Sequence, residues 1–140
     1  MPPAPRLRGV LETAVYVTDL ERSRDFYSRQ LGLSVMTGDD RFCAFDVGGR
    51  DVFLLFRKRA TLEMVQTPGG GIPPHDGDGQ LHFAFAIAAE DLASWEQRLR
   101  RAGVEIESRV AWARGGHSLY FRDPDGHLVE LATPGLWANY

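Results

Sequence analysis

Three ionisable side chains stand in strand-like segments where charges are uncommon, and together they could bind a divalent metal ion. They are Glu12, His82 and Glu130. Glu130 lies between Val129 and Leu131 in a run typical of a buried strand. An ionised carboxylate out of water is costly unless a cation or hydrogen-bond donors compensate for its lost hydration. We therefore expect a positive group beside Glu130, supplied by the elements around it.

A tight turn precedes the strand of Glu130. In the run Asp-Pro-Asp-Gly at residues 123–126, proline fixes φ at the second turn position and glycine accepts the positive φ that often follows. The turn joins two predicted strands, residues 118–122 and 127–131. His127 follows the turn directly, and we expect it at the surface.

Composition limits the partners of the chain. The 140 residues contain 16 Lys and Arg against 19 Asp and Glu, a net charge of −3, with no basic face that would bind nucleic acid. The single cysteine, Cys43, excludes an internal disulfide and is expected in the core. No run is long and apolar enough for a membrane span. We expect a cytoplasmic protein with a disordered leader, residues 1–9, before one domain, residues 10–140.

The first half predicts one strand, one helix and three further strands. In residues 10–17, alternation places Glu12, Ala14 and Tyr16 on one face of a strand. Thr18 to Glu21 matches a capping box, which predicts a helix that begins with Thr18 as its cap and ends at Gly32. Strands are then expected over residues 33–36, 41–47 and 51–56.

A Gly- and Pro-rich connection, residues 61–80, leads to a second half that repeats the first. It is expected to act as a linker and a partial lid. The pattern then predicts a strand over 81–87, a helix from 90–92 to Gly103, and strands over 104–107, 118–122 and 127–131, with a loop at 112–116. The chain is thus predicted to be an α+β fold of two tandem βαβββ modules, residues 10–60 and 81–132.

The duplication relates the three ionisable residues to one another. Glu12 and His82 hold the same position on the first strand of each module, and Glu130 lies on the last strand of the second. His82 shares its face with Ala84 and Ala86, and small side chains beside a polar one are typical of a cavity wall. Two carboxylates and an imidazole that converge in a cavity would bind a divalent metal and leave positions open for water or substrate.

These residues resemble the glyoxalase, bleomycin-resistance and extradiol-dioxygenase group, the vicinal oxygen chelate superfamily. The resemblance rests on residues 17–20, Phe26-Tyr27, Leu31-Gly32 and the run 121–131. It implies two βαβββ modules whose curled mixed sheets form a cleft around a metal, with Glu12, His82 and Glu130 as ligands. The fourth ligand of glyoxalase I enzymes would fall near Leu54, which cannot bind metal, and a first-strand Glu replaces the His usual in dioxygenases and fosfomycin-resistance enzymes.

The resemblance implies a metal-dependent enzyme that acts on a small vicinal-oxygen substrate. The ligand types, two carboxylates and an imidazole, favour Mn, Ni, Co, Zn or Fe(II) over copper as the ion. Lyase or isomerase chemistry, like that of lactoylglutathione lyase, is favoured over dioxygenase chemistry. Glu12 or Glu130 could shuttle protons, and His117 could act as acid or base at the cleft mouth.

Family members usually pair, so the resemblance also implies a homodimer, in which a second chain could complete the cleft. The alternative function is that of a metal-free protein that sequesters a drug, as bleomycin-resistance proteins do in aromatic-lined grooves. Three tryptophans keep this alternative open, and four residues are candidates for the pocket lining. The tryptophans are Trp95, Trp112 and Trp137, and the lining candidates are Tyr16, Arg41, Trp112 and Tyr120.

Overall fold

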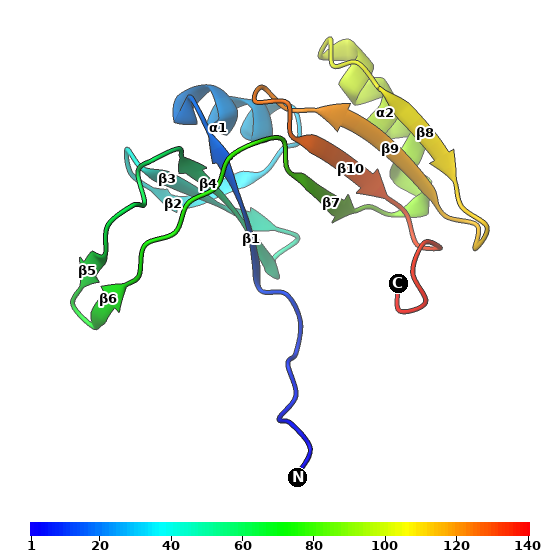
Figure 1. Cartoon of the computed structure of the whole chain (residues 1–140). Helices are drawn as coiled ribbons and strands as arrows, with labels where there is room; N and C mark the ends of the chain where they lie inside the picture. Colours follow the sequence, from blue (N-terminus) through cyan, green and yellow to red (C-terminus); the bar gives the residue numbers. More distant parts are fainter.

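The computed structural model describes all 140 residues and shows two βαβββ modules in tandem (Figure 1). This confirms the predicted α+β fold and the internal duplication. No helix in the chain has the length and apolarity needed to span a bilayer. The first module contains β1 (Glu12–Val17), α1 (Leu20–Arg29), β2 (Ser34–Gly38), β3 (Phe42–Val47) and β4 (Asp51–Arg57). The second contains β7 (His82–Ala86), a short 3-10 turn (Ala89–Asp91), α2 (Leu92–Arg101), β8 (Ser108–Ala111), β9 (His117–Arg122) and β10 (Leu128–Ala132).

Each module forms one open, four-stranded mixed sheet, with the strand order β1-β4-β3-β2 in the first and β7-β10-β9-β8 in the second. In both sheets the first and last strands of the module pair in parallel, and their register is the same. The equivalent pairs are Glu12 with Val52 and Ala14 with Leu54 in the first sheet, and His82 with Leu128 and Ala84 with Glu130 in the second.

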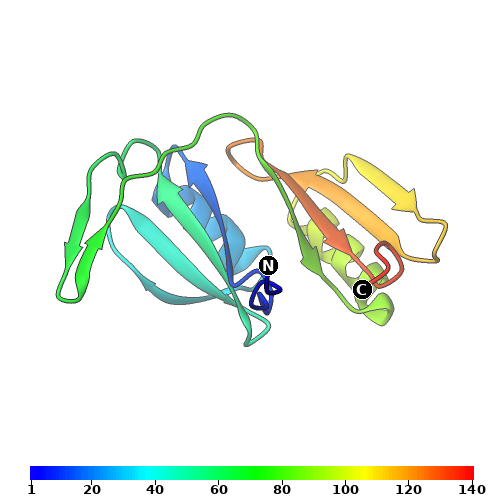
Figure 2. The same cartoon turned by 60° about the horizontal axis from the view of Figure 1, so that its bottom comes forward.

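Both helices lie on the same side of the two sheets, and the opposite faces of the sheets are open (Figure 1). The edge strands β1 and β7 are next to each other in the middle of the molecule, where the modules meet (Figure 2). Residues 1–11 have no regular structure, are exposed and extend away from β1. The fold therefore leaves on each module one sheet face that no helix covers, called the uncovered face below.

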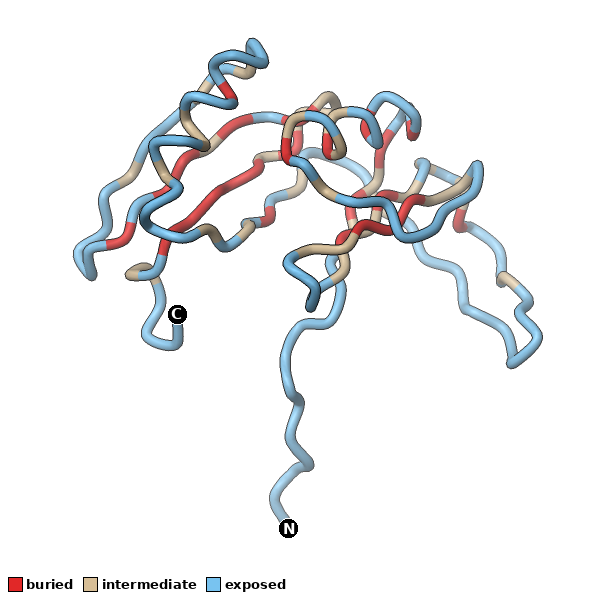
Figure 3. Tube along the Cα trace, turned by 180° about the vertical axis from the view of Figure 1, so that it is seen from behind, coloured by how far each residue is buried: buried red, intermediate tan, exposed pale blue.

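One hydrophobic core runs through both modules and lies between the sheets and the helices (Figure 3). Aromatic rings join its two halves: the centroid of Phe53 is 4.8 Å from that of Tyr27 in its own module and 4.8 Å from that of Phe83 in the other. Cys43 is buried in this core, as predicted. Because the core is shared, the modules are held in a fixed relation.

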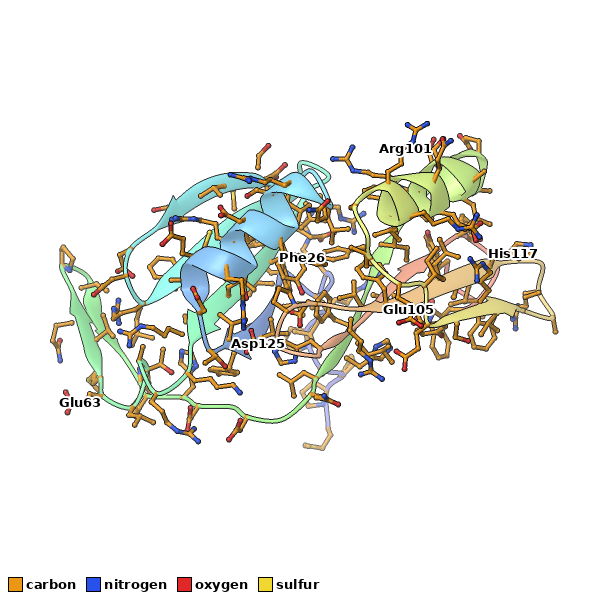
Figure 4. All side chains as sticks on the ribbon, turned by 90° about the horizontal axis from the view of Figure 1, so that it is seen from above. Phe26, Glu63, Arg101, Glu105, His117 and Asp125 are labelled. Atoms are coloured by element: carbon orange, nitrogen blue, oxygen red, sulfur yellow. The ribbon has the colours of Figure 1, made fainter.

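The turn before β10 holds the first turn of α1. The carboxylate of Asp125 accepts hydrogen bonds from the backbone N–H of Thr18 at 2.9 Å, the Thr18 hydroxyl at 2.6 Å and the Ser23 hydroxyl at 3.3 Å (Figure 4). The predicted cap at Thr18 was wrong. Asp19 is the N-cap and accepts from the backbone N–H of Arg22 at 3.0 Å. The Thr18 hydroxyl instead donates a hydrogen bond to Asp125, 107 positions away in the sequence. A local sequence pattern does not predict such a contact.

The other end of α1 is also held by the second module. Arg98, on α2, donates hydrogen bonds to the carbonyl of Gln30 at 2.7 Å and to that of Arg29 at 2.8 Å. These carbonyls end the helix, where the macrodipole is negative and backbone acceptors lack partners within the helix. A carboxylate at one end and a guanidinium at the other thus stabilise α1 from the neighbouring module.

His127 is fully buried, so the prediction that it lies at the surface was wrong. Its Nδ1 accepts from the backbone N–H of Leu81 at 2.9 Å, and its Nε2 donates to the backbone carbonyl of Tyr16 at 2.8 Å. The imidazole therefore satisfies one backbone group from each module. Such a long-range role cannot be inferred from a position next to a turn.

Two segments differ from the prediction in secondary structure. The strand expected over 104–107 is a connection, and β8 (Ser108–Ala111) follows it. Val104 and Ile106 pack against the core from this connection, which explains the strand-like pattern. Within the linker, β5 (Val65–Thr67) and β6 (Gly70–Ile72) form a small hairpin that was not predicted.

Candidate metal-binding site

The uncovered face of the second sheet carries a pocket of about 470 Å³. His82 and Glu130 both line it, from the parallel strands β7 and β10. Ala84 and Ala86 follow His82 on the same face of β7 and also line the pocket, as the alternation predicted. The small alanine side chains leave space above the imidazole and the carboxylate.

His82 and Glu130 face each other with Nε2 and Oε1 3.4 Å apart. The Nδ1 atom of His82 lies 2.9 Å from the backbone carbonyl of Leu128, which can only accept, so Nδ1 carries the proton. In the neutral imidazole, Nε2 then directs a lone pair at a carboxylate oxygen. A cation between these two acceptors, a proton or a metal ion, makes the contact favourable. The donor set therefore fits a divalent metal, and the carbonyl fixes the imidazole as in known metal sites.

Glu130 is buried, with only 5% of its surface exposed, and its second oxygen is already bonded. The Ser118 hydroxyl donates to Oε2 at 2.5 Å and itself accepts from the indole N–H of Trp112 at 2.8 Å. Burial raises the pKa of nearby Tyr120, and the carboxylate of Glu130 raises it further. The bond from Ser118 thus occupies Oε2, and Oε1 faces His82.

Glu12 lies on the other sheet. It is exposed and lines a second pocket of about 480 Å³ beneath the first sheet, together with Ala14 and Leu54. No cluster of three metal-binding side chains occurs within one chain. A single copy therefore brings His82 and Glu130 together and holds Glu12 apart from them, in a separate pocket.

His117 does not line either pocket. It begins β9 and is exposed at the far end of the second module (Figure 4). Because its neighbour Ser118 points to Glu130, strand alternation directs the His117 side chain to the opposite face of the sheet.

The other candidates for the pocket lining divide between the two faces. Trp112 and Tyr120 line the pocket of the second sheet, and Arg41 lines that of the first. Tyr16 lines neither and pairs with His75, whose Nδ1 is 2.6 Å from the Tyr16 hydroxyl. His75 is exposed, as predicted, and also lines the first pocket.

Sequence reasoning missed Ser118 and the place of the C-terminal segment in a pocket, whereas it did expect residues 61–80 to act as a partial lid. The signal for Ser118 was a small hydroxyl two residues before Tyr120, and therefore on the same face of the strand. The first pocket is partly covered by the linker through six residues, and the second by the C-terminal segment through three. These are Thr61, Glu63, Val65, Ile72, Pro73 and His75 for the linker, and Leu136, Trp137 and Tyr140 for the C-terminal segment.

Comparisons with known proteins identify the family and match the fold. The family model for the glyoxalase/bleomycin resistance protein/dioxygenase superfamily matches residues 9–131. Glutathione transferase FosA of Serratia marcescens is 31% identical over 136 residues, which cover 95% of this chain and 86% of that protein. Metallothiol transferase FosB of Bacillus licheniformis is 29% identical over 133 residues, which cover 94% of this chain and 79% of that protein. The crystal structure of a lactoylglutathione lyase from Agrobacterium tumefaciens has a TM-score of 0.86 at 29% identity and covers 96% of this chain and 99% of that one.

Proposed function

The chain belongs to the glyoxalase/bleomycin resistance protein/dioxygenase superfamily, and we propose that it is a divalent-metal-dependent enzyme acting on a small molecule through two adjacent oxygens. The observation that carries the proposal is the pair of His82 and Glu130, whose free lone pairs face each other at 3.4 Å in a pocket. The relatives named above are called transferases and a lyase, which supports an enzyme.

We propose that Glu12 of a second copy supplies the third ligand. Within one chain Glu12 lines a different pocket from His82 and Glu130. In a homodimer with twofold symmetry, the first sheet of each copy can face the second sheet of the other, and the arrangement is reciprocal. Two equivalent sites would form, each with a carboxylate from one copy and the His82 and Glu130 pair from the other.

The protein's own groups would bind and orient the substrate. A bound divalent ion would act as a Lewis acid toward the substrate oxygens. Ser118 and Trp112 hold Glu130 in place, so that only Oε1 is free for binding. Glu12, the exposed carboxylate, is suited to accept a proton from the substrate. This division of roles favours lyase or isomerase chemistry, in which a proton moves, over dioxygenase chemistry.

Elemental analysis of protein purified without chelator or nickel resin tests the proposal. We expect about one divalent ion per chain, selected from Mn, Ni, Co, Zn or Fe(II). Glu130→Ala should lose the ion, whereas Glu63→Ala, a change to another pocket carboxylate, should keep it. Wild-type protein that binds none of these ions, even after each is added, would overturn the proposal.

One observation favours a second candidate function, a metal-free protein that sequesters a drug. The pocket of the second sheet has aromatic walls, including Trp112 and Trp137. A sequestering protein would bind its ligand equally well with and without divalent ions. Ligand affinity that depends on the metal would therefore exclude this candidate.

A further inference from the structure

The side chain of His127 connects the two strands that carry Glu12 and His82. These strands, β1 and β7, are edge strands of separate sheets, and no strand pairing joins them (Figure 2). Resting on the proposed function, we propose that His127 is a positioning residue of the metal site, because it sets the separation of the two strands. In the proposed dimer each copy gives Glu12 to one site and His82 to the other. The separation within one chain therefore determines the dimensions of both sites.

The imidazole of His127 is hydrogen-bonded to one backbone group at the edge of each sheet. Its Nε2 donates to the carbonyl of Tyr16 on β1 at 2.8 Å, and its Nδ1 accepts from the N–H of Leu81, the residue before β7, at 2.9 Å. A carbonyl can only accept and a backbone N–H can only donate, so one neutral tautomer satisfies both groups. Because the side chain is fully buried, no water can replace either bond. The imidazole thus takes the place of the missing pairing between the strands.

The bond to Leu81 fixes the strand of His82. Leu81 directly precedes His82, and its carbonyl accepts from the N–H of Leu128 at 2.8 Å. The carbonyl of Leu128 lies 2.9 Å from Nδ1 of His82 and orients that ring. Residues 127 and 128 therefore hold both the backbone before His82 and its side chain, and Glu130 follows two residues later on the same strand.

The bond to Tyr16 fixes the strand of Glu12. Tyr16 is held at both ends, since its carbonyl accepts from His127 and its hydroxyl lies 2.6 Å from Nδ1 of His75 in the linker. Both Glu12 and Tyr16 belong to β1, and alternation places them on the same face of the strand. A shift of Tyr16 relative to β7 would therefore move Glu12 as well.

The backbone of His127 is itself anchored to the first module. Its N–H donates to Oδ1 of Asp123 at 2.9 Å, and Oδ2 of Asp123 accepts from the hydroxyl of Tyr27 on α1 at 2.6 Å. Burial raises the pKa of Tyr27, and the charge of Asp123 raises it further, so the hydroxyl keeps the proton that it donates. The imidazole thus has a fixed base and two fixed partners, as a group that positions ligands requires.

Two substitutions divide the connection and test the inference. Asparagine has an acceptor near the place of Nδ1 but is too short to reach Tyr16, so His127→Asn should keep only the bond to Leu81. Glutamine reaches as far as Nε2 and lacks an acceptor at Nδ1, so His127→Gln should keep only the bond to Tyr16. Hydrogen exchange of the Leu81 amide checks this design without metal: it should be slow in wild type and His127→Asn and faster in His127→Gln.

Calorimetric titration with Co(II) then gives the metal affinity of each variant. We expect both to bind Co(II) at least about tenfold more weakly than wild type, the lower end of the effect of groups that orient ligands. The visible spectrum of the bound Co(II) should also change, since it depends on the geometry of the ligands. The matched control is Asp125→Asn, which breaks a contact between the modules that involves no ligand strand. It should keep the wild-type spectrum, with an affinity within about twofold.

The outcomes separate this inference from the proposed function. If both folded His127 variants keep the affinity and spectrum of wild type, the inference is overturned and the proposed function stands. A loss in only one variant also overturns it, because one contact and not the separation of the strands would then matter. Equal losses in Asp125→Asn would show that general stability is responsible. Wild-type protein that binds no divalent ion contradicts the proposed function, on which this role of His127 rests.

A further variant keeps the test decisive if neither His127 variant folds, as judged by circular dichroism. Tyr27→Phe removes the hydrogen bond that holds Asp123 and so loosens the base of His127, while the imidazole stays in place. It should weaken Co(II) binding and change the spectrum, whereas Asp125→Asn should do neither. An unchanged spectrum and affinity in Tyr27→Phe would then overturn the inference.

Discussion

The two sheets share one backbone plan and differ in the side chains on their uncovered faces. Leu54 occupies the position equivalent to Glu130, and their parallel strands have the same register. The comparison extends over three positions: the second sheet has His82, Glu130 and Ser118 where the first has Glu12, Leu54 and Phe42. The second face therefore carries a histidine and a carboxylate that face each other and the hydroxyl that orients the carboxylate, whereas the first offers one carboxylate. In the proposed function, a full ligand set takes residues from one face of each kind.

The turns that join the last two strands of each module also differ between the modules. In the first module Gly48 and Gly49, with φ of 65° and 70°, make a tight hairpin, and neither glycine has a side chain that could reach another element. In the second, the turn at 123–126 carries Asp125 to the start of α1. The second module thus supplies the polar contacts that fix the first module in place.

The largest effect on metal affinity is expected when a residue of the second sheet is replaced by its equivalent in the first sheet. Glu130→Leu places the first-sheet residue at the equivalent position and removes a proposed ligand. We expect metal affinity to fall more than about a hundredfold, since even groups that only orient a ligand are worth roughly 10- to 100-fold. Metal titration gives the affinity, and circular dichroism checks the fold. Metal binding that survives in folded Glu130→Leu would contradict the assignment of the site.

Removing the orienting hydroxyl gives a smaller effect. Ser118→Ala frees Oε2 of Glu130 from its 2.5 Å hydrogen bond, so we expect metal affinity to fall about 10- to 100-fold. Phe42→Ala is the matched control, because Phe42 holds the equivalent position in the first sheet. Equal losses in the two variants would show that packing, and not orientation, determines the affinity.

The contact between the turn and α1 predicts a pH-dependent stability. Burial would raise the pKa of Asp125, but hydrogen bonds from Thr18 and Ser23 and the charge of Arg22 lower it overall, below its ordinary 3.8. A carboxylate with a lowered pKa stabilises the fold above its ordinary pKa, and this contribution disappears as pH falls through the folded-state value.

Asp125→Asn should therefore lower the free energy of unfolding by about 1–2 kcal/mol at neutral pH. The difference from wild type should shrink below about pH 4, the region of the ordinary carboxyl pKa. Urea unfolding at several pH values measures both quantities. A difference that stays constant down to pH 2 would show that the charge of Asp125 is not responsible.

The smallest effect is expected at His117. Its side chain lies on the face of the second sheet opposite the pocket, so His117→Ala should change metal affinity less than about twofold, within the range of ordinary surface substitutions. Activity, once a substrate is known, should likewise be unchanged, with the same pH profile. If the pH profile of His117→Ala lacked an ionisation that wild type shows, His117 would instead act as an acid or base.

Much of the fold could be predicted because it depends on local patterns repeated twice. Alternation along residues 10–17 separated Glu12 from the core side of its strand, and the internal repeat placed Glu12 and His82 in equivalent registers. The Asp-Pro-Asp-Gly run correctly predicted the turn. These inferences needed only neighbours within a few residues or a comparison of the two halves.

The remainder depended on contacts between distant residues. Thr18 resembles a helix cap locally but bonds to Asp125, and His127 is buried because it joins backbone groups from both modules. The sequence also could not show that one chain leaves Glu12 in a separate pocket from His82. That separation follows from how the two sheets sit side by side, which no periodicity records.

The central claim is that each metal site takes Glu12 from one copy and His82 with Glu130 from the other. Complementation tests it most directly. Glu12→Ala and Glu130→Ala chains are co-expressed with two different tags that bind no metal, and mixed dimers are isolated through both tags. Each variant alone should bind no metal. In the mixed dimer one site combines both substitutions and the other keeps every ligand, so we predict about half of the wild-type metal content. A mixed dimer as empty as its two parents would contradict the account, as would a chain that stays monomeric while it holds its metal.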